Sequence, residues 1–444
     1  MLDRRTLLAR TASSAGTALL ARAPWISRRP SDRPDILLVV LDDVGWPEVD
    51  ADHVPLAALR GLLESSRILR GAYGFPLGAP TIYSAYTGRY PERDGLVTSF
   101  PYWGTQSGAT PMLSPKRVVL PRLLSAAGYA TGLFGKWNLG RAPEGKRSET
   151  PLASGFDVWR AGVPTNVDAG GGVGYKDWVR VEDGDERRDR SYQTTALRDA
   201  FTAWWEKTRG PRFAVCHFQA AHAPLHQPPQ ELLPQAWPDL QPAQRFWKLD
   251  GFEGQRLKKR WPERKRYLAL LQTVSTCLEP MLAAVGPDTI VVLTSDNGTP
   301  GKVAALDRDD EKLKGTTFDG GIHVPLAFRV PGLASGTSEE LASSVDLCAT
   351  LLELAGVDRG EEARDSRSLL PLLERNEPVR EWIYTASRRS RALRTKTHKL
   401  RVTEDGNEVY EVERLPSEKR PMSPKRKQLA ALEEELASLL AGVL

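Results

Sequence analysis

The chain has 444 residues, of which 41% are apolar, and a formal net charge of +5. A chain of this length and composition can bury a large core, which excludes a disordered or fibrous protein and favours one large domain with a smaller one. Residues 1–23 carry four arginines and one aspartate, a net +3, so without this segment the formal charge is +2. A nearly neutral chain gives no electrostatic reason to expect nucleic acid as a partner, and we predict none.

The N-terminal sequence MLDRRTLLARTASSAGTALLARA predicts a twin-arginine-type export signal over residues 1–23. It has paired arginines at Arg4 and Arg5 and ends in Ala-Arg-Ala at Ala23. A plain amphipathic N-terminus is the alternative. The apolar part is far shorter than the roughly 20 residues of a membrane-spanning helix, and no later run reaches that length. We therefore expect an exported protein, periplasmic or extracellular, without a membrane span.

Three continuous apolar runs predict central strands that are buried on both faces. They are DILLVVLDD (35–43), FAVCHFQAAH (213–222) and TIVVLTSDNG (289–298). Helical patterns lie between them, at 121–130, 192–207 and 267–285. This alternation predicts an α/β sheet layered with helices, in which functional groups gather at the carboxyl ends of the strands.

Toward the C-terminus, short alternating runs flank the turn EDGN, which predicts a small antiparallel sheet before a final amphipathic helix. We therefore expect a large domain over 33–375 and a small α+β subdomain over 376–444. The segments 169–174 and 181–190 are predicted to be surface loops. The basic run from Arg388 to Arg401 is interpreted as a solvated sheet face rather than a polyanion-binding patch.

Hard oxygen ligands stand at the ends of two predicted strands. Asp42 and Asp43 end the first run, and Asp296 and Asn297 end the third. Three carboxylates and one amide suit Ca²⁺, or Mg²⁺, better than zinc. Adjacent aspartates also occur as helix or turn caps, but the second acidic strand end favours a metal site.

Eight segments occur in the order found in sulfatases of the alkaline phosphatase superfamily, and the chain resembles this arylsulfatase-like family over roughly residues 33–422. They are ILLVVLDDVGW, PTIYSAYTGRYPERDGL, GYATGLFGKWNLG, AAHAPLHQP, TSDNG, KGTTFDGGIHVPLAFRVPG, SVDLCATLLELAGV and LRTKTHKLRVTEDGNEVYEVERLPSE. The resemblance implies the fold of that family, a mixed sheet between helices, and places the chain among the sulfuric ester hydrolases.

The resemblance also implies a defect. In sulfatases a cysteine in a Cys-x-Pro-Ser-Arg motif is converted to formylglycine, whose hydrated aldehyde attacks the sulfate ester while a divalent cation, usually calcium, holds it. The matching segment here is Gly78, Ala79, Pro80, Thr81 and Ile82. Glycine cannot become formylglycine, and isoleucine cannot bind the aldehyde as arginine does. Asn138 replaces the family's usual histidine in GKWNLG and cannot act as a general acid or base near neutral pH.

The remaining pocket positions match the family. The resemblance assigns the metal to Asp42, Asp43, Asp296 and Asn297. It assigns binding of the sulfate and assistance to its departure to Lys136, His222 and Lys314. Asp319 stands where the family often has glutamate. Taken alone, each lysine is more typical of a solvated charge and His222 of a satisfied strand-end histidine, so these assignments depend on the motifs around them.

We therefore predict a sulfatase-family protein whose metal pocket binds a sulfated or phosphorylated small molecule or saccharide, with little or no turnover. One alternative is an active sulfate or phosphate ester hydrolase that uses Thr81 or a metal-bound water as its nucleophile. Another is a non-catalytic binding or interaction protein on a sulfatase scaffold. The sequence does not determine the oligomeric state.

Overall fold

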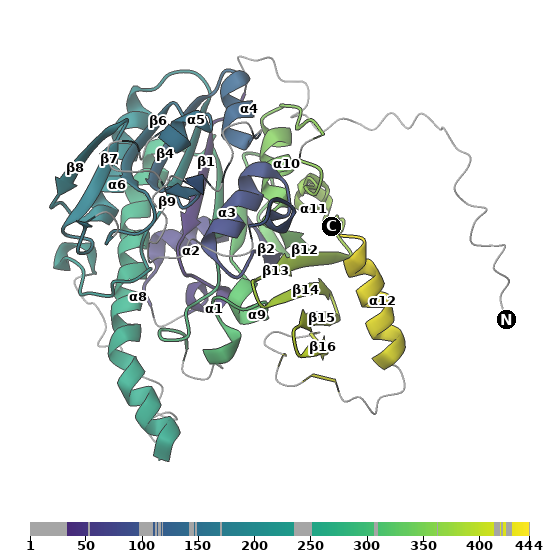
Figure 1. Cartoon of the computed structure of the whole chain (residues 1–444). Helices are drawn as coiled ribbons and strands as arrows, with labels where there is room; N and C mark the ends of the chain where they lie inside the picture. Colours follow the sequence, from purple (N-terminus) through teal and green to yellow (C-terminus); the bar gives the residue numbers. More distant parts are fainter. Residues whose placement is uncertain are drawn as a thin grey trace, which may run out of the picture.

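The computed structural model describes residues 33–443 except 52–53, 97–109, 112, 114–116, 118, 142–145, 147–148, 169–170, 235–250, 306–309, 362, 413–417, 419–420 and 423–428. A large α/β body lies beside a small sheet and the C-terminal helix (Figure 1). The predicted export signal over residues 1–23 lies outside the described residues. The division into two domains at residue 375 stays a prediction.

Among the described residues, ten strands form one mixed sheet, and its centre consists of the three predicted strands. β1 lies between β10 and β9 and is parallel to both, while β11, β7 and β8 bring antiparallel pairing toward the two edges. In sheet order the strands are β12 (Gly336–Ser343), β2 (Arg67–Tyr73), β11 (Leu326–Arg329), β10 (Ile290–Ser295), β1 (Ile36–Leu41), β9 (Arg212–His217), β4 (Ala130–Lys136), β6 (Val158–Val163), β7 (Trp178–Glu182) and β8 (Asp185–Asp189).

Helices cover both faces of this sheet, which explains why β1 is buried at every position. Leu37 and Val39 pack into one core with α2, α6 and α8, whereas Leu38 and Val40 pack into a second core with α3, α4, α10 and α11. The helices of the large body are α1 (Trp46–Val49), α2 (Ala57–Glu64), α3 (Gly78–Thr87), α4 (Leu120–Ala126), α5 (Glu149–Ala153), α6 (Gln193–Lys207), α8 (Gly251–Val285), α9 (Asp319–Ile322), α10 (Asp346–Leu354) and α11 (Leu370–Arg375).

The long helix α8 is the one described segment that resembles a membrane span. Its part Lys259–Val285 is long and apolar enough to cross a membrane by length and composition, with a hydropathy of 1.5. However, 67% of that apolar window is buried inside the protein, and α8 packs on α6 and α2. A core helix passes the same test, so α8 is not evidence for a membrane span.

The predicted C-terminal sheet and helix are confirmed. Four antiparallel strands in chain order form the small sheet, and the hairpin between the last two encloses the predicted turn. α12 (Leu429–Ala441) packs on this sheet through Leu436. The strands are β13 (Trp382–Ala386), β14 (Ser390–Thr395), β15 (His398–Thr403) and β16 (Gly406–Glu411).

Two local predictions were wrong. The segment 181–190 is not a surface loop, because β7 and β8 form a hairpin whose turn residues Asp183 and Gly184 both have positive φ. An Asp-Gly pair is a strong hairpin signal that the charged sequence obscured. The helix expected over 121–130 ends at Ala126, because the chain turns at Gly128 with φ +90° and then enters β4.

The basic run near the C-terminus is not simply a solvated face. Lys399 and Arg394 are buried and form ion pairs with Asp319, and Lys399 also contacts Glu418 at 2.6 Å. Arg391, in contrast, is half exposed and pairs with a glutamate at the surface. The alternation of a strand therefore divides the run between an internal charge cluster and the solvent.

Candidate functional site

The predicted acidic residues meet because β1 and β10 are neighbouring parallel strands. Their register places Leu41 beside Ser295, so the aspartates that follow β1 lie against Asp296 and Asn297. The Asp43 backbone N–H donates to Asp296 Oδ1 at 3.1 Å, and Asn297 Nδ2 donates to Asp43 Oδ1 at 2.7 Å. All four side chains are buried, and Asp43 turns the chain in a left-handed conformation with φ +67°.

Two oxygens of this group lack the partner that a buried polar atom normally has. Among the described residues, neither Asp42 Oδ1 nor Asn297 Oδ1 has a hydrogen-bond partner. Leaving such an atom unpaired costs about 1–3 kcal/mol, and more for a charged group. A divalent cation would satisfy both oxygens, and carboxylate and amide oxygens are ligands that hard cations prefer. The residues present therefore fit a divalent metal.

Three cationic or titratable side chains approach the acidic group from other elements. Lys136, at the end of β4, lies 2.6 Å from Asp42 Oδ2, and Lys314 forms an ion pair with Asp43. His222 Nε2 lies 3.9 Å from Asp43 Oδ2. Burial would raise the pKa of Asp42, but the charges of Lys136, His222 and Lys314 hold that pKa well below its usual range.

Gly78 lies against the same group at the start of α3. A Cβ atom built on Gly78 would come 2.1 Å from Asp296 Oδ2 and 2.8 Å from Asn138 Nδ2. The Asp296 carboxylate thus occupies the place into which a side chain at position 78 would project. Ile82, one helical turn later, is buried in the core with α3 and presents no polar group.

Thr81 is engaged in the loop that leads into α3. Its Oγ1 accepts a hydrogen bond from the Phe75 backbone N–H at 2.9 Å, and it lies within 3.3 Å of the Leu77 carbonyl oxygen. The residue is buried, with 2% of its surface exposed. Its hydroxyl therefore already has a structural role in closing this loop.

Asp319 lies apart from the acidic group. It begins α9, and its carboxylate lies 2.7 Å from Lys399 Nζ, while its backbone N–H donates to Glu418 at 2.6 Å. Burial would raise the pKa of Asp319, but Lys399 and Arg394 lower it to about 2. Asp319 joins the small sheet to the loop that precedes α9.

The sequence reasoning missed His217, the last residue of β9. It is completely buried, and its Nε2 lies 3.9 Å from Asp296 Oδ2. Burial and the nearby charge of Lys136 lower the pKa of His217 to about 3, so the imidazole is neutral. The available signal was a histidine inside an apolar strand buried on both faces, where a polar side chain needs a partner.

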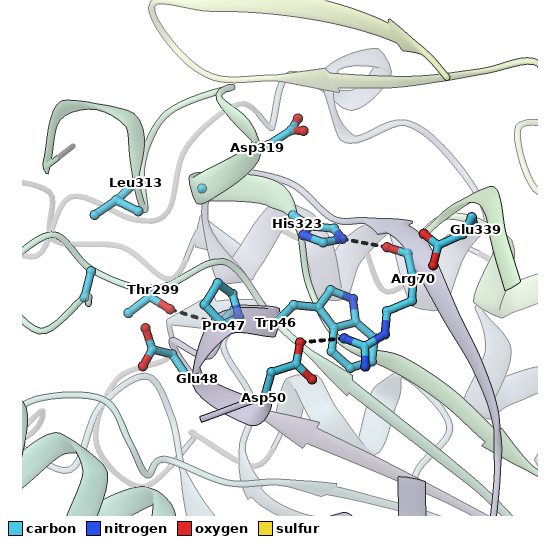
Figure 2. Close-up of a pocket in the computed structure, with 13 residues that line it drawn as sticks. Trp46, Pro47, Glu48, Asp50, Arg70, Thr299, Leu313, Asp319, His323 and Glu339 are labelled. Carbon is cyan, nitrogen blue, oxygen red and sulfur yellow. Dashed lines mark hydrogen bonds and ion pairs between the residues drawn. The ribbon is translucent and has the colours of Figure 1, made fainter. Parts of the chain in front are cut away.

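A separate pocket of about 260 Å³ is lined by residues of the loops that follow β1 and β10, among them Trp46 and Thr299. Figure 2 shows Trp46 under the Arg70 side chain, with Asp50 paired to Arg70 and His323 above. Thr299 accepts a hydrogen bond from the Gly45 backbone N–H at 3.1 Å, which ties the two loops together. Nothing in the sequence indicated this pocket.

Comparison with known proteins places the chain in a family. The sulfatase family model matches residues 34–357, which is most of the chain. The chain therefore belongs to the sulfatase family, and the resemblance found in its motifs is confirmed. Sulfatases generally bind a divalent metal, and this chain has an acidic cluster of the kind that holds one.

Individual relatives agree with this assignment. The N-acetylgalactosamine-6-sulfatase of Sus scrofa is 28% identical over 391 residues, which are 77% of this chain and 66% of that protein. The chain thus spans about two-thirds of the length of the curated relatives it matches. Arylsulfatase A of Homo sapiens is also 28% identical, over 77% of this chain and 68% of that protein.

Solved structures confirm the predicted fold. The crystal structure of Ps i-CgsB in complex with k-i-k-neocarrahexaose has a TM-score of 0.74 and 22% identity, and the match covers 92% of both chains. The structure of BT4656 in complex with its substrate D-glucosamine-2-N,6-O-disulfate has a TM-score of 0.68 and 19% identity, and the match covers 92% of this chain and 97% of that chain.

Proposed function

We propose that this sulfatase-family protein uses a divalent-cation pocket to bind a sulfated saccharide, or a related sulfated or phosphorylated small molecule, with little or no turnover. The proposal depends on one observation: the acidic group formed by Asp42, Asp43 and Asp296 is paired with Lys136 and Lys314 and lies against Gly78. The charged groups that would hold a cation and an anion are present, whereas position 78 offers no nucleophile.

The cation would be held by Asp42, Asp43, Asp296 and Asn297, and by resemblance it would be Ca²⁺ or Mg²⁺. When bound, it would supply positive charge toward an anionic ester group. Lys136, Lys314 and His222 would add donors to that anion from three different elements. Among the solved structures of this fold, that of BT4656 contains its substrate D-glucosamine-2-N,6-O-disulfate and that of Ps i-CgsB contains k-i-k-neocarrahexaose, which supports this ligand class.

The expected loss of turnover follows from the side chains at the start of α3. Gly78 has no side-chain atom, and Ile82 is apolar and buried. In a hydrolase whose nucleophile was removed by mutation, the rate fell about 10⁶-fold, and about 10³- to 10⁴-fold acceleration over water remained. We expect any residual hydrolysis by this protein to be similarly slow.

Removing one metal ligand should abolish stabilisation by the cation. We expect Ca²⁺ or Mg²⁺, added to the chelator-treated protein, to raise its melting temperature by a few degrees, because an ion at 100 times its dissociation constant adds about 2.7 kcal/mol. Asp296→Asn should lose this shift. Asp199→Asn is the matched control, because Asp199 is 65% exposed on α6. An unchanged shift in Asp296→Asn would mean that the ion binds elsewhere.

The Thr81 alternative can be tested separately. We expect Thr81→Val to leave any residual ester hydrolysis unchanged and to lower the free energy of unfolding by about 1–3 kcal/mol, because the buried Phe75 N–H loses its acceptor. Thr87→Val, in the same helix, is the control. Hydrolysis of sulfate and phosphate esters and chemical denaturation would be measured. Loss of hydrolysis in the folded Thr81→Val protein alone would support Thr81 as the nucleophile.

The interaction-protein alternative makes the opposite prediction about the metal ligands. It requires that their replacement leave the melting temperature unchanged, with and without the added ion, which the Asp296→Asn experiment also measures. Export of the protein stays a prediction from residues 1–23, and deletion of the Arg4–Arg5 pair, with measurement of its cellular location, would test it.

A further inference from the structure

We propose that His217 is a metal ligand, and that the candidate metal site therefore takes a first-row transition ion such as Zn²⁺ in preference to Ca²⁺. This inference rests on the proposed metal pocket and concerns which ion the pocket selects. It is based on three side chains: Asp42, His217 and Asp296.

The sheet brings these three residues together. β9 lies beside β1, and the register pairs His217 with Val40, two residues before Asp42. β10 lies on the other side of β1 and ends next to Asp296. Each of the three side chains offers one ligand atom within 4.8 Å of the other two, and all three are buried. His217 and Asp296 thus approach Asp42 from β9 and β10, the two strands that flank β1.

In the described part of the chain, the His217 imidazole makes no hydrogen bond of ordinary geometry, although the backbone of Lys136 interacts with it. Neither ring nitrogen of His217 has a hydrogen-bond partner there, although the side chain is completely buried. A buried polar side chain is nearly always hydrogen-bonded or bound to a metal. Asp42 Oδ1 also lacks a partner, while Lys136 contacts only the other oxygen of Asp42 within hydrogen-bond distance. An imidazole and a carboxylate oxygen without a hydrogen-bond partner of ordinary geometry therefore lie in one buried cluster.

The distances suit a small ion. Zinc binds histidine nitrogen and carboxylate oxygen at about 2.0–2.2 Å, so two such ligands of one ion lie no more than about 4.3 Å apart. His217 Nε2 and Asp296 Oδ2 are 3.9 Å apart. An ion between them would use Asp42 and Asp296, which also belong to the four proposed oxygen ligands.

The donor chemistry determines the selectivity. An all-oxygen set of carboxylates and an amide suits Ca²⁺, whereas an imidazole nitrogen favours zinc and its neighbours in the first row. Gly78 adds no ligand of its own, and a Cβ there would overlap the Asp296 carboxylate. In this proposal the additional ligand of the ion comes from His217, because the residue at position 78 has no side chain to offer one.

Cobalt is a spectroscopic probe for this site. The chelator-treated full chain would be titrated with Co²⁺ while its visible absorption is recorded, and the binding of Zn²⁺ and Ca²⁺ would be measured by calorimetry. We expect a visible band typical of nitrogen and oxygen ligation and tighter binding of Zn²⁺ than of Ca²⁺. His217→Gln should lose the band and bind Zn²⁺ at least about tenfold more weakly, while its Ca²⁺ affinity stays the same. His226→Ala is the control, because His226 packs on Tyr175.

The outcomes separate this inference from the proposed function. If folded His217→Gln and His217→Ala, checked by circular dichroism, bind Co²⁺ and Zn²⁺ as the parent does, His217 is not a ligand and the inference is overturned. If Ca²⁺ binds, depends on Asp296, and outcompetes Zn²⁺, the metal pocket stands and only the inferred selectivity fails. If no divalent ion binds the parent, or if the binding does not depend on Asp296, the proposal of a metal pocket is wrong. The inference about His217 is then wrong as well.

Discussion

Restoring three family residues, with Gly78→Cys, Ile82→Arg and Asn138→His together, is expected to create formylglycine-dependent sulfatase activity on the order of 10³-fold or more above the parent. The estimate follows from the size of the loss when a hydrolase is deprived of its nucleophile. The charged groups around position 78 remain in place in the parent, so the new nucleophile would meet a pocket that already holds Lys136 and Lys314. The protein would be produced with the maturation enzyme, and sulfate ester hydrolysis would be measured.

The structure also predicts a cost of this restoration. A Cβ at position 78 would overlap Asp296 Oδ2 at 2.1 Å, so the buried carboxylate must turn away. We expect Gly78→Cys alone to lower the free energy of unfolding by about 1–3 kcal/mol, as overpacking of a buried site does. Chemical denaturation of the single variant would measure this cost.

A triple variant with alanine at position 78 is the matched control, because it introduces the same Cβ against Asp296 but cannot form formylglycine. Mass spectrometry would report the conversion of the cysteine. If the cysteine is converted in a folded protein and sulfate esters are still not hydrolysed, the missing nucleophile is not what limits hydrolysis, and our account of the pocket is wrong.

Replacing Lys399 by methionine is expected to destabilise the protein by about 3–5 kcal/mol, because removing one partner of a buried ion pair leaves an uncompensated charge. Lys399 is completely buried between Asp319 and Glu418, at 2.7 Å and 2.6 Å. In the variant, Arg394 stays paired with Asp319, but neither carboxylate keeps its contact with a lysine ammonium at position 399. Thermal denaturation should show a clear drop, whereas Lys396→Met should have almost no effect, because Lys396 is half exposed in its pair with Glu340.

The destabilisation should depend on pH. In the parent, Lys399 and Arg394 hold the pKa of Asp319 at about 2, so the stabilisation from this carboxylate is present at neutral pH and is lost as the pH falls through about 4 toward 2. Without Lys399 that depression weakens, and the two carboxylates repel each other when both are charged. The stability difference between variant and parent should therefore be larger at pH 7 than near pH 4. An equal difference at both pH values would show that the lost contact is packing rather than charge.

The sequence by itself determined much of the centre of this protein. Apolar runs without alternation predicted the central strands β1, β9 and β10, because strands covered by helices on both faces bury all their side chains. The pairs Asp42–Asp43 and Asp296–Asn297 follow two of these strands, and parallel neighbours end at one edge, so their meeting was predictable. Comparison of Gly78, Ile82 and Asn138 with the sulfatase motifs that the chain resembles led to the prediction that the usual nucleophile is missing.

Only the tertiary structure decided the relations that depend on pairing between distant strands. His217 faces Asp42 and Asp296 because β9 pairs with β1 in one particular register, and a shift of one residue would turn its side chain to the other face of the sheet. Asp319 pairs with Lys399 because the small sheet docks against α9. The Asp296 carboxylate covers Gly78 because α3 begins against the end of β10. Local patterns specify strands and helices, but burial and partners of a charge depend on which elements pack together.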